Sequence, residues 1–163
     1  LITVGGIGYL GWVAAYFIDL RSLPDGLWWL LIVFIIVWIA DAAAYFVGVR
    51  FGNHKMFSRL SPKKSWEGYV GGVVAGTLSA GLLALFLNRT NLLATGIWAT
   101  VGLGLMLSTL TTLGDLGESL FKRFAGIKDS GSFLPGHGGA FDRIDSLIWA
   151  GALGYFWIRQ LML

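Results

Sequence analysis

Long apolar stretches are the feature that most limits how this chain of 163 residues can fold. A helix needs about 20 mostly apolar residues to cross the hydrocarbon core of a bilayer, which is roughly 30 Å thick. Five stretches reach or approach that length: 1–18, 27–49, 69–87, 91–114 and 147–158. We expect each to be a membrane-spanning helix, the last being the weakest. The predicted fold class is all-α, a polytopic transmembrane bundle with about five spanning helices and two long cytoplasmic loops.

Composition excludes several other classes of protein. With 56% hydrophobic and 13% charged residues the chain is not a water-soluble globule, and with 15% aromatic residues it is not a disordered one. The lack of cysteine excludes disulfides, thiolate nucleophiles, iron–sulfur clusters and cysteine zinc sites. Glycines are frequent in the third stretch, where such small residues allow helices to approach closely in lipid.

The basic residues indicate which side of the membrane each loop faces. Of the 12 lysines and arginines, five lie within 50–68 and four within 115–146. Because cytoplasmic loops carry an excess of Lys and Arg, we expect these two loops to face the cytoplasm, and 19–26 and 88–90 to face outward. The net charge of +3 is then explained by topology and phosphate binding, so nucleic acid is not needed as a partner.

The second of these loops is rich in chemistry-bearing side chains. Residues 111–146 contain five of the nine acids: Asp115, Glu118, Asp129, Asp142 and Asp145. If the fourth helix continues past Gly114, then Asp115, Glu118, Ser119 and Lys122 share one face, flanked by Arg123. If the fifth helix starts early, Asp142 and Asp145 lie one turn apart, with Arg143 projecting elsewhere.

A glycine-rich turn, 131–139, lies between these helical ends and cannot be regular helix. Its backbone N–H groups are free to face anionic oxygens. Carboxylates hold hard cations such as Mg²⁺, and Lys and Arg neutralise phosphate oxygens. Together these parts favour phosphoryl or nucleotidyl transfer at the membrane surface. The alternatives are solvated loop charges, and a histidine at 137 that only caps a helix.

Three segments resemble the signature of the CDP-diacylglycerol synthase family, also called phosphatidate cytidylyltransferases. The longest has Ser119, Lys122-Arg123, Lys128-Asp129, Leu134 to Gly139, and Asp142-Arg143-Ile144-Asp145. The others are 41–52, beginning Asp-Ala-Ala-Ala-Tyr, and 61–68, which reads Ser-Pro-Lys-Lys-Ser-Trp-Glu-Gly. Ser65 stands where the family more often has threonine, a change that keeps the hydroxyl. Family members are longer and residue 1 is Leu, so we expect residues 1–163 to be one transmembrane catalytic region, the C-terminal part of a longer protein.

The resemblance implies the reaction of CTP with phosphatidate to give CDP-diacylglycerol and pyrophosphate. It implies a metal centre of Asp115, Asp142 and Asp145 that holds Mg²⁺, with a second cation such as K⁺. Catalytic roles are expected for Asp142, Asp145, Lys122 and Arg143. The residues expected to bind CTP or phosphate are Ser61, Lys63, Lys64, Ser119, Arg123, Lys128, Asp129, Gly136, His137, Gly138 and Gly139. The expected partners are CTP, phosphatidate and membrane lipids, and a homodimer is considered as an assembly.

Three alternatives to this function stay open at this point. A CTP-dependent polyprenol or phytol kinase would release CDP instead of pyrophosphate. A transporter would use Asp41, an acid within an apolar helix, as its ion site. A folded fragment without catalysis is the third. The expected location is a bacterial inner (cytoplasmic) membrane, with the active site facing the cytoplasm.

Overall fold

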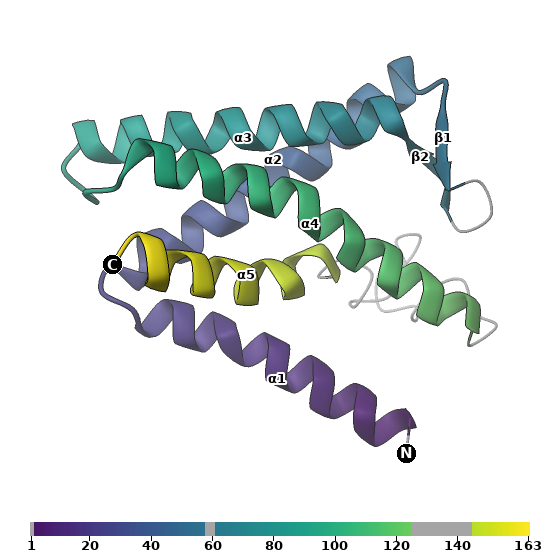
Figure 1. Ribbon diagram of the computed structural model, residues 1–163, viewed down its shortest axis with the longest axis horizontal. Helices are drawn as coiled ribbons and strands as arrows, with labels where there is room; N and C mark the ends of the chain where they lie inside the picture. The colour runs from purple at the N-terminus through teal and green to yellow at the C-terminus, as the bar shows by residue number, and fades with distance from the viewer. Residues whose placement is uncertain (1, 58–60, 125–144) are drawn as a thin grey trace, which may run out of the picture.

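The computed structural model describes residues 2–57, 61–124 and 145–163. These residues form five helices and one β-hairpin (Figure 1): α1 (Ile2–Ser22), α2 (Gly26–Phe51), β1 (Lys55–Phe57), β2 (Ser61–Ser65), α3 (Trp66–Arg89), α4 (Ile97–Phe124) and α5 (Asp145–Leu161). The five expected helices are therefore present as helices. They differ from the predicted ranges mainly at their ends, and α4 differs most, because it begins six residues later and continues beyond Gly114.

Two of these helices are long and apolar enough to cross a membrane, among the residues that the structure describes. They are α2 and α3, whose most apolar stretches have mean hydropathy 2.5 and 2.0. Only 28% and 33% of those stretches are buried inside the protein. A water-soluble protein buries its most apolar helices, so these exposed ones are suited to lipid. Spanning by α1, α4 and α5 stays a prediction. The apolar part of α4, Ile97–Thr112, is shorter than the apolar helices α2 and α3.

The outward surface of the bundle is apolar at many positions. Phe46 is 70% exposed, Leu82 67% and Trp98 85%. Inside, buried Trp29, Ile36 and Leu103 belong to one hydrophobic cluster to which all five helices contribute, α1 through Leu20. Apolar side chains thus occupy both the inside and the outside of the bundle, which is the pattern of a membrane protein.

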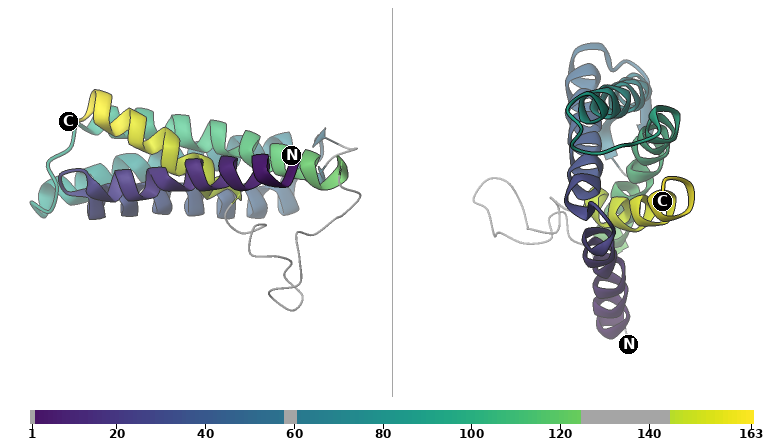
Figure 2. Two further views of the ribbon diagram at one scale, coloured as in Figure 1. Left: turned by 90° about the horizontal axis from the view of Figure 1, so that it is seen from below. Right: turned by 90° about the vertical axis from the view of Figure 1, so that its left-hand side faces the viewer.

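The helices run roughly side by side along the long axis of the molecule (Figures 1 and 2). In chain order α2 packs on α3, α3 on α4 and α4 on α5, while α1 packs on α5 and α2. The end of α2, the start of α3 and the end of α4 therefore lie at the same end of the bundle as the hairpin (Figure 1). We call it the hairpin end. It is also the end at which both long loops were expected.

The hairpin corrects the all-α prediction for the loop at 50–68. Strands β1 and β2 pair antiparallel, with Lys55 opposite Ser65 and Phe57 opposite Ser61, and the register shifts between these two pairs. A segment with Pro62 and two adjacent lysines has no apolar alternation to indicate a strand. The pairing between the two strands is what makes these residues extended.

Glycines make close contacts between the helices. An added Cβ at Gly72 on α3 would lie 2.8 Å from the carbonyl oxygen of Ala40 on α2, and one at Gly76 would overlap the Ser108 hydroxyl of α4. The prediction that glycines in this stretch permit close helix approach is therefore confirmed. This packing holds α2, α3 and α4 together up to the hairpin end.

Candidate functional site

The polar end of α4 has the helical backbone that the spacing of its side chains requires. The helix continues to Phe124, so Asp115, Glu118, Ser119 and Lys122 lie on one face by helical register, with Arg123 beside it. The side chains of 115–124 lie outside the described part. Before them, Ser108, Thr109 and Thr111 hydrogen-bond to carbonyls of their own helix, so these hydroxyls are already used within α4.

Helix α5 begins at Asp145, so one predicted metal ligand is the first residue of a helix. An acid at this position also interacts favourably with the helix N-terminus. Other predicted site residues lie outside the described residues: Lys128, Asp129, Gly136, His137, Gly138, Gly139, Asp142 and Arg143. Whether Asp142 lies one helical turn from Asp145 therefore stays a prediction.

A packing contact joins α4 and α5 next to two of the predicted ligands. An added Cβ at Gly114 on α4 would lie 2.6 Å from Cδ1 of Trp149 on α5, which means that the Trp149 ring rests on the glycine. Asp115 directly follows Gly114, and Asp145 is four residues, about one helical turn, before Trp149. The two helix backbones thus bring residues 115 and 145 to the same region of the α4–α5 interface.

The other predicted phosphate-binding residues lie on β2. Ser61 opens the strand and is half-buried, and Lys64 has its Nζ atom buried. The side chain of Lys63 lies outside the described part. A buried ammonium group is costly unless it meets an anion or hydrogen-bond acceptors, and Lys64 takes part in an interaction within the protein. Lys64 turns its charge inward at the hairpin end.

Ser65 ends β2 and begins α3. Its side chain is 3% exposed, and its Oγ accepts a hydrogen bond from the backbone N–H of Gly68 at 3.2 Å. This is a helix N-cap, in which a serine oxygen satisfies an otherwise unpaired N–H of the first turn. The hydroxyl of the Ser-Pro-Lys-Lys-Ser segment is therefore occupied in α3, which agrees with a serine or threonine at this position.

Sequence reasoning missed a contact between the hairpin and α3. Glu67, in the first turn of α3, has its Oε1 atom 2.6 Å from Nδ1 of His54. Both carboxylate oxygens of Glu67 also accept from the backbone N–H of His54, at 3.2 and 3.3 Å. The two residues are 13 positions apart, so no helical or strand spacing indicates the pair. Only the hairpin itself brings them together.

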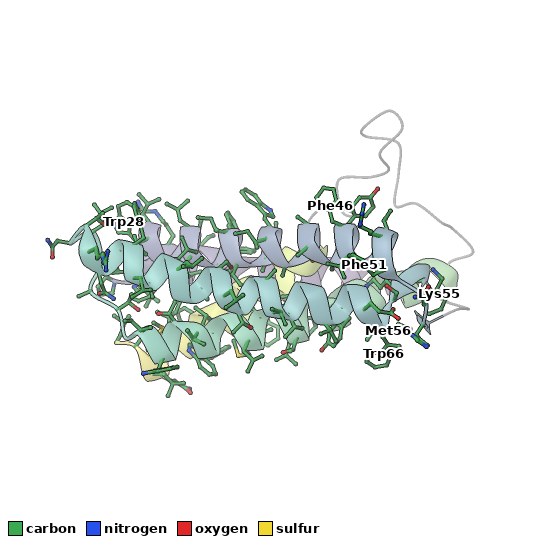
Figure 3. The ribbon with its side chains drawn as sticks, turned by 90° about the horizontal axis from the view of Figure 1, so that it is seen from above. Trp28, Phe46, Phe51, Lys55, Met56 and Trp66 are labelled. Carbon is green, nitrogen blue, oxygen red and sulfur yellow. The ribbon has the colours of Figure 1, made fainter. Side chains whose placement is uncertain are left out.

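Cations and aromatic rings gather on the surface of the hairpin end. Figure 3 shows Phe51, Lys55, Met56 and Trp66 there, and Trp28 at the opposite end of the molecule. The Arg50 guanidinium lies 5.8 Å from the centre of the Phe51 ring. Such a mixture is typical of the boundary between lipid and water.

The acidic residue within α2 does not lie in the protein interior. Asp41 is exposed on the surface of α2, as are Trp38 and Tyr45 one turn on either side. Among the side chains that the structure describes, no three His, Cys, Asp or Glu residues come together to hold a metal ion. The metal centre of Asp115, Asp142 and Asp145 stays a prediction, because the side chains of all three lie outside the described part.

The sequence matches the profile described as the "Cytidylyltransferase family" over residues 1–161. It is 47% identical to a phosphatidate cytidylyltransferase of Haemophilus influenzae over 122 residues, which are 75% of this chain and 42% of the relative. It is 41% identical to a phosphatidate cytidylyltransferase of Staphylococcus aureus over 143 residues, 88% of this chain and 53% of the relative. A protein of the same name from Staphylococcus haemolyticus is 42% identical over 143 residues. The chain thus spans about half the length of the curated relatives it matches.

Proposed function

The chain belongs to the cytidylyltransferase family, and from this premise we propose that it transfers the cytidylyl group of CTP to phosphatidate. A phosphate oxygen of phosphatidate attacks the α-phosphorus of CTP, the bond from that phosphorus to the β-phosphate oxygen breaks, and pyrophosphate leaves. The products are CDP-diacylglycerol and pyrophosphate. The single observation that carries the location of the site is the α4–α5 contact of Gly114 with Trp149, next to Asp115 and Asp145.

The chemistry of this reaction matches the residues on these elements. Both substrates are anions that repel each other, so the site must supply positive charge and hold the two phosphates in line. On α4, Lys122 and Arg123 are the proposed phosphate ligands, and on β2 the proposed phosphate ligand is Lys64. The nucleophile is part of the substrate, so the chain does not need to supply one.

Carboxylates of Asp115, Asp142 and Asp145 are the proposed ligands for Mg²⁺. Their oxygen donors fit a hard cation, and the contact of Gly114 on α4 with Trp149 on α5, one residue before Asp115 and about one helical turn after Asp145, supports the assignment. Bound Mg²⁺ would neutralise negative charge on the phosphates. A monovalent cation such as K⁺ is the proposed second ion.

Replacing one proposed ligand tests this assignment. Asp145→Asn and Asp142→Asn should lower pyrophosphate release from CTP and phosphatidate in mixed micelles at least about 100-fold, because a group that acts on the transition state is lost. Asp19→Asn, an exposed acid on α1, is the matched control and should keep full turnover. Near-normal turnover of either site variant would contradict the metal assignment. Release of CDP in place of pyrophosphate would identify a lipid kinase instead.

We further propose that the hairpin end faces the cytoplasm of a bacterial cell and that the chain is embedded in the inner membrane. Lys55 at that end and Ala94 in the turn between α3 and α4 are both exposed, and the chain has no cysteine. In intact cells, a membrane-impermeant thiol reagent should label Ala94→Cys and spare Lys55→Cys until the cells are opened. The reverse pattern would overturn the orientation.

A further inference from the structure

Two exposed cations at the hairpin end have no acidic partner within the described part of the protein. Arg50 lies in the last turn of α2, and Lys55 is the first residue of β1. Among the residues that the structure describes, neither makes an ion pair. Glu67, in the first turn of α3, is engaged by His54 instead, through the imidazole Nδ1 and the backbone N–H. The charges of Arg50 and Lys55 are therefore open to a partner outside the protein.

Two cations at the opposite end of the bundle have compensating neighbours. Arg21 has the exposed acids Asp19 and Asp25 within four positions of it in the chain. Arg159 donates to the Tyr155 hydroxyl at 2.5 Å and lies 5.7 Å from the centre of the same ring. Arg21 and Arg159 carry the same formal charge as Arg50 and Lys55 in a different setting, so they serve as matched controls.

The length of α2 places Arg50 at the boundary between hydrocarbon and water. From Gly26 to Arg50 the helix rises about 36 Å, at 1.5 Å per residue, whereas the hydrocarbon core is about 30 Å thick. With the start of α2 at one surface, Arg50 thus lies just beyond the other. The exposed rings of Phe51 and Trp66 lie at the same end (Figure 3), and aromatic rings are enriched at this boundary.

Contacts between the hairpin and α3 hold Lys55 near the same level. The backbone carbonyl of His54 accepts from the N–H of Trp66 at 3.0 Å. Lys55 itself pairs with Ser65, the N-cap of α3. Lys55 is therefore attached beside the first turn of a helix that is long and apolar enough to cross the membrane. From there a long lysine side chain reaches the headgroup region.

We propose that Arg50 and Lys55 form a docking surface for anionic phospholipids of the surrounding leaflet, whose headgroup phosphates supply the acidic partners that the two side chains lack. A lipid offers a phosphate and acyl chains together, which matches cations that lie beside exposed rings. Phe46 and Trp66 lie on opposite sides of the hairpin end in Figure 3, as expected for contact with a layer that surrounds the protein. The inference rests on the part of the proposed function that embeds the chain in a bilayer.

Titration with an anionic lipid that is not a substrate tests this surface. The melting temperature of the protein is measured in phosphatidylcholine nanodiscs that contain increasing fractions of phosphatidylglycerol. For the wild type we expect it to rise with phosphatidylglycerol, because a ligand that binds only the folded state stabilises that state. In the Arg50→Gln/Lys55→Gln double variant the rise should shrink to less than about half, since each basic residue near an anionic surface adds to the attraction.

The matched control is Arg21→Gln/Arg159→Gln, which removes the same formal charge and should keep the wild-type rise. An equal rise in the wild type and in Arg50→Gln/Lys55→Gln would overturn the inference. It would also be overturned if inorganic phosphate, added to phosphatidylcholine nanodiscs, gave a rise of the same size that this double variant abolishes. That result would indicate a site for a soluble anion in place of a lipid surface.

Folding and the proposed reaction are separated by the same preparations. In pure phosphatidylcholine the double variant should melt with the wild type, because both side chains are exposed; if it does not, Lys55→Gln alone repeats the comparison with the same expected direction. Loss of turnover with an intact effect of phosphatidylglycerol counts against the proposed reaction alone. Failure of the wild type to enter nanodiscs of either composition would overturn the placement in a bilayer, and this inference with it.

Discussion

Two helix interfaces of this protein use glycine in different ways. Between α2 and α3 two glycines face backbone: an added Cβ would lie 2.7 Å from the Ala44 carbonyl at Gly68 and 2.8 Å from the Ala40 carbonyl at Gly72, while a third, Gly71, faces the Val47 side chain. Around α5 they face side chains instead. Rings or branched side chains rest on Gly151, Gly154, Gly102 and Gly114.

The difference concerns what can move. A backbone carbonyl within a helix cannot shift without displacing its helix, whereas an aromatic ring can turn or slide. The α2–α3 interface is therefore the rigid one, and the hairpin lies at its end. The α5 interfaces are adjustable, and α5 begins with the proposed ligand Asp145. The proposed phosphate ligand on β2 thus rests on rigid packing, whereas the proposed metal ligand Asp145 rests on packing that can adjust.

The largest effect is expected for Gly72→Ala. Its methyl group would be forced against the Ala40 carbonyl and the Ala44 side chain, at 2.8 and 3.0 Å, so α2 and α3 must separate. We expect the free energy of unfolding in detergent to fall by about 2–3 kcal/mol, after allowing for the better helix propensity of alanine. Gly11→Ala on α1 is the control, because no atom lies within 4 Å of an added Cβ there. Equal stability of the two variants would contradict the rigid interface.

A smaller effect is expected for Gly102→Ala. The added methyl group would lie 2.7 Å from Cζ2 of Trp157, whose Nε1 donates to the Ala99 carbonyl at 3.0 Å. The ring can move at the expense of this hydrogen bond, so we expect a loss of about 1 kcal/mol. In a double-mutant cycle, Trp157→Phe should relieve most of the cost that Gly102→Ala adds. Strict additivity of the two changes would show that the methyl group and the ring do not interact.

The helices were predictable from the sequence, and the hairpin was not. Apolar runs of about 20 residues constrain the chain to helix in lipid, so α2 and α3 differ from their predicted ranges by only one to three residues at either end. Helical backbone beyond Gly114 entered the sequence analysis only as a condition, under which Asp115, Glu118, Ser119 and Lys122 share one face. Hydropathy alone predicted the end of α4 too early, at Gly114. The helix continues beyond that residue with polar side chains, which a search for apolar residues does not detect.

The contact of His54 with Glu67 could not be predicted because it is not local. His54 and Glu67 meet only after β1 and β2 pair, and neither residue has a period or neighbour that indicates a partner. Ser65 differs, since a serine three positions before Gly68 and just ahead of an apolar run is a sequence signal for an N-cap. For Asp142 and the glycine-rich turn, the resemblance to the family carries the prediction.

The turn between α3 and α4 has a consequence for how the chain enters a membrane. There the Asn88 side chain donates to the Thr95 carbonyl at 2.8 Å and accepts from the Thr95 N–H at 2.9 Å. The turn thereby satisfies part of its own hydrogen bonding, and Asn91 supplies the left-handed residue that reverses the chain. In the proposed orientation this turn is the part that must be translocated. A self-satisfied tip exposes fewer polar groups to hydrocarbon, so α3 and α4 are suited to insertion as one helical hairpin.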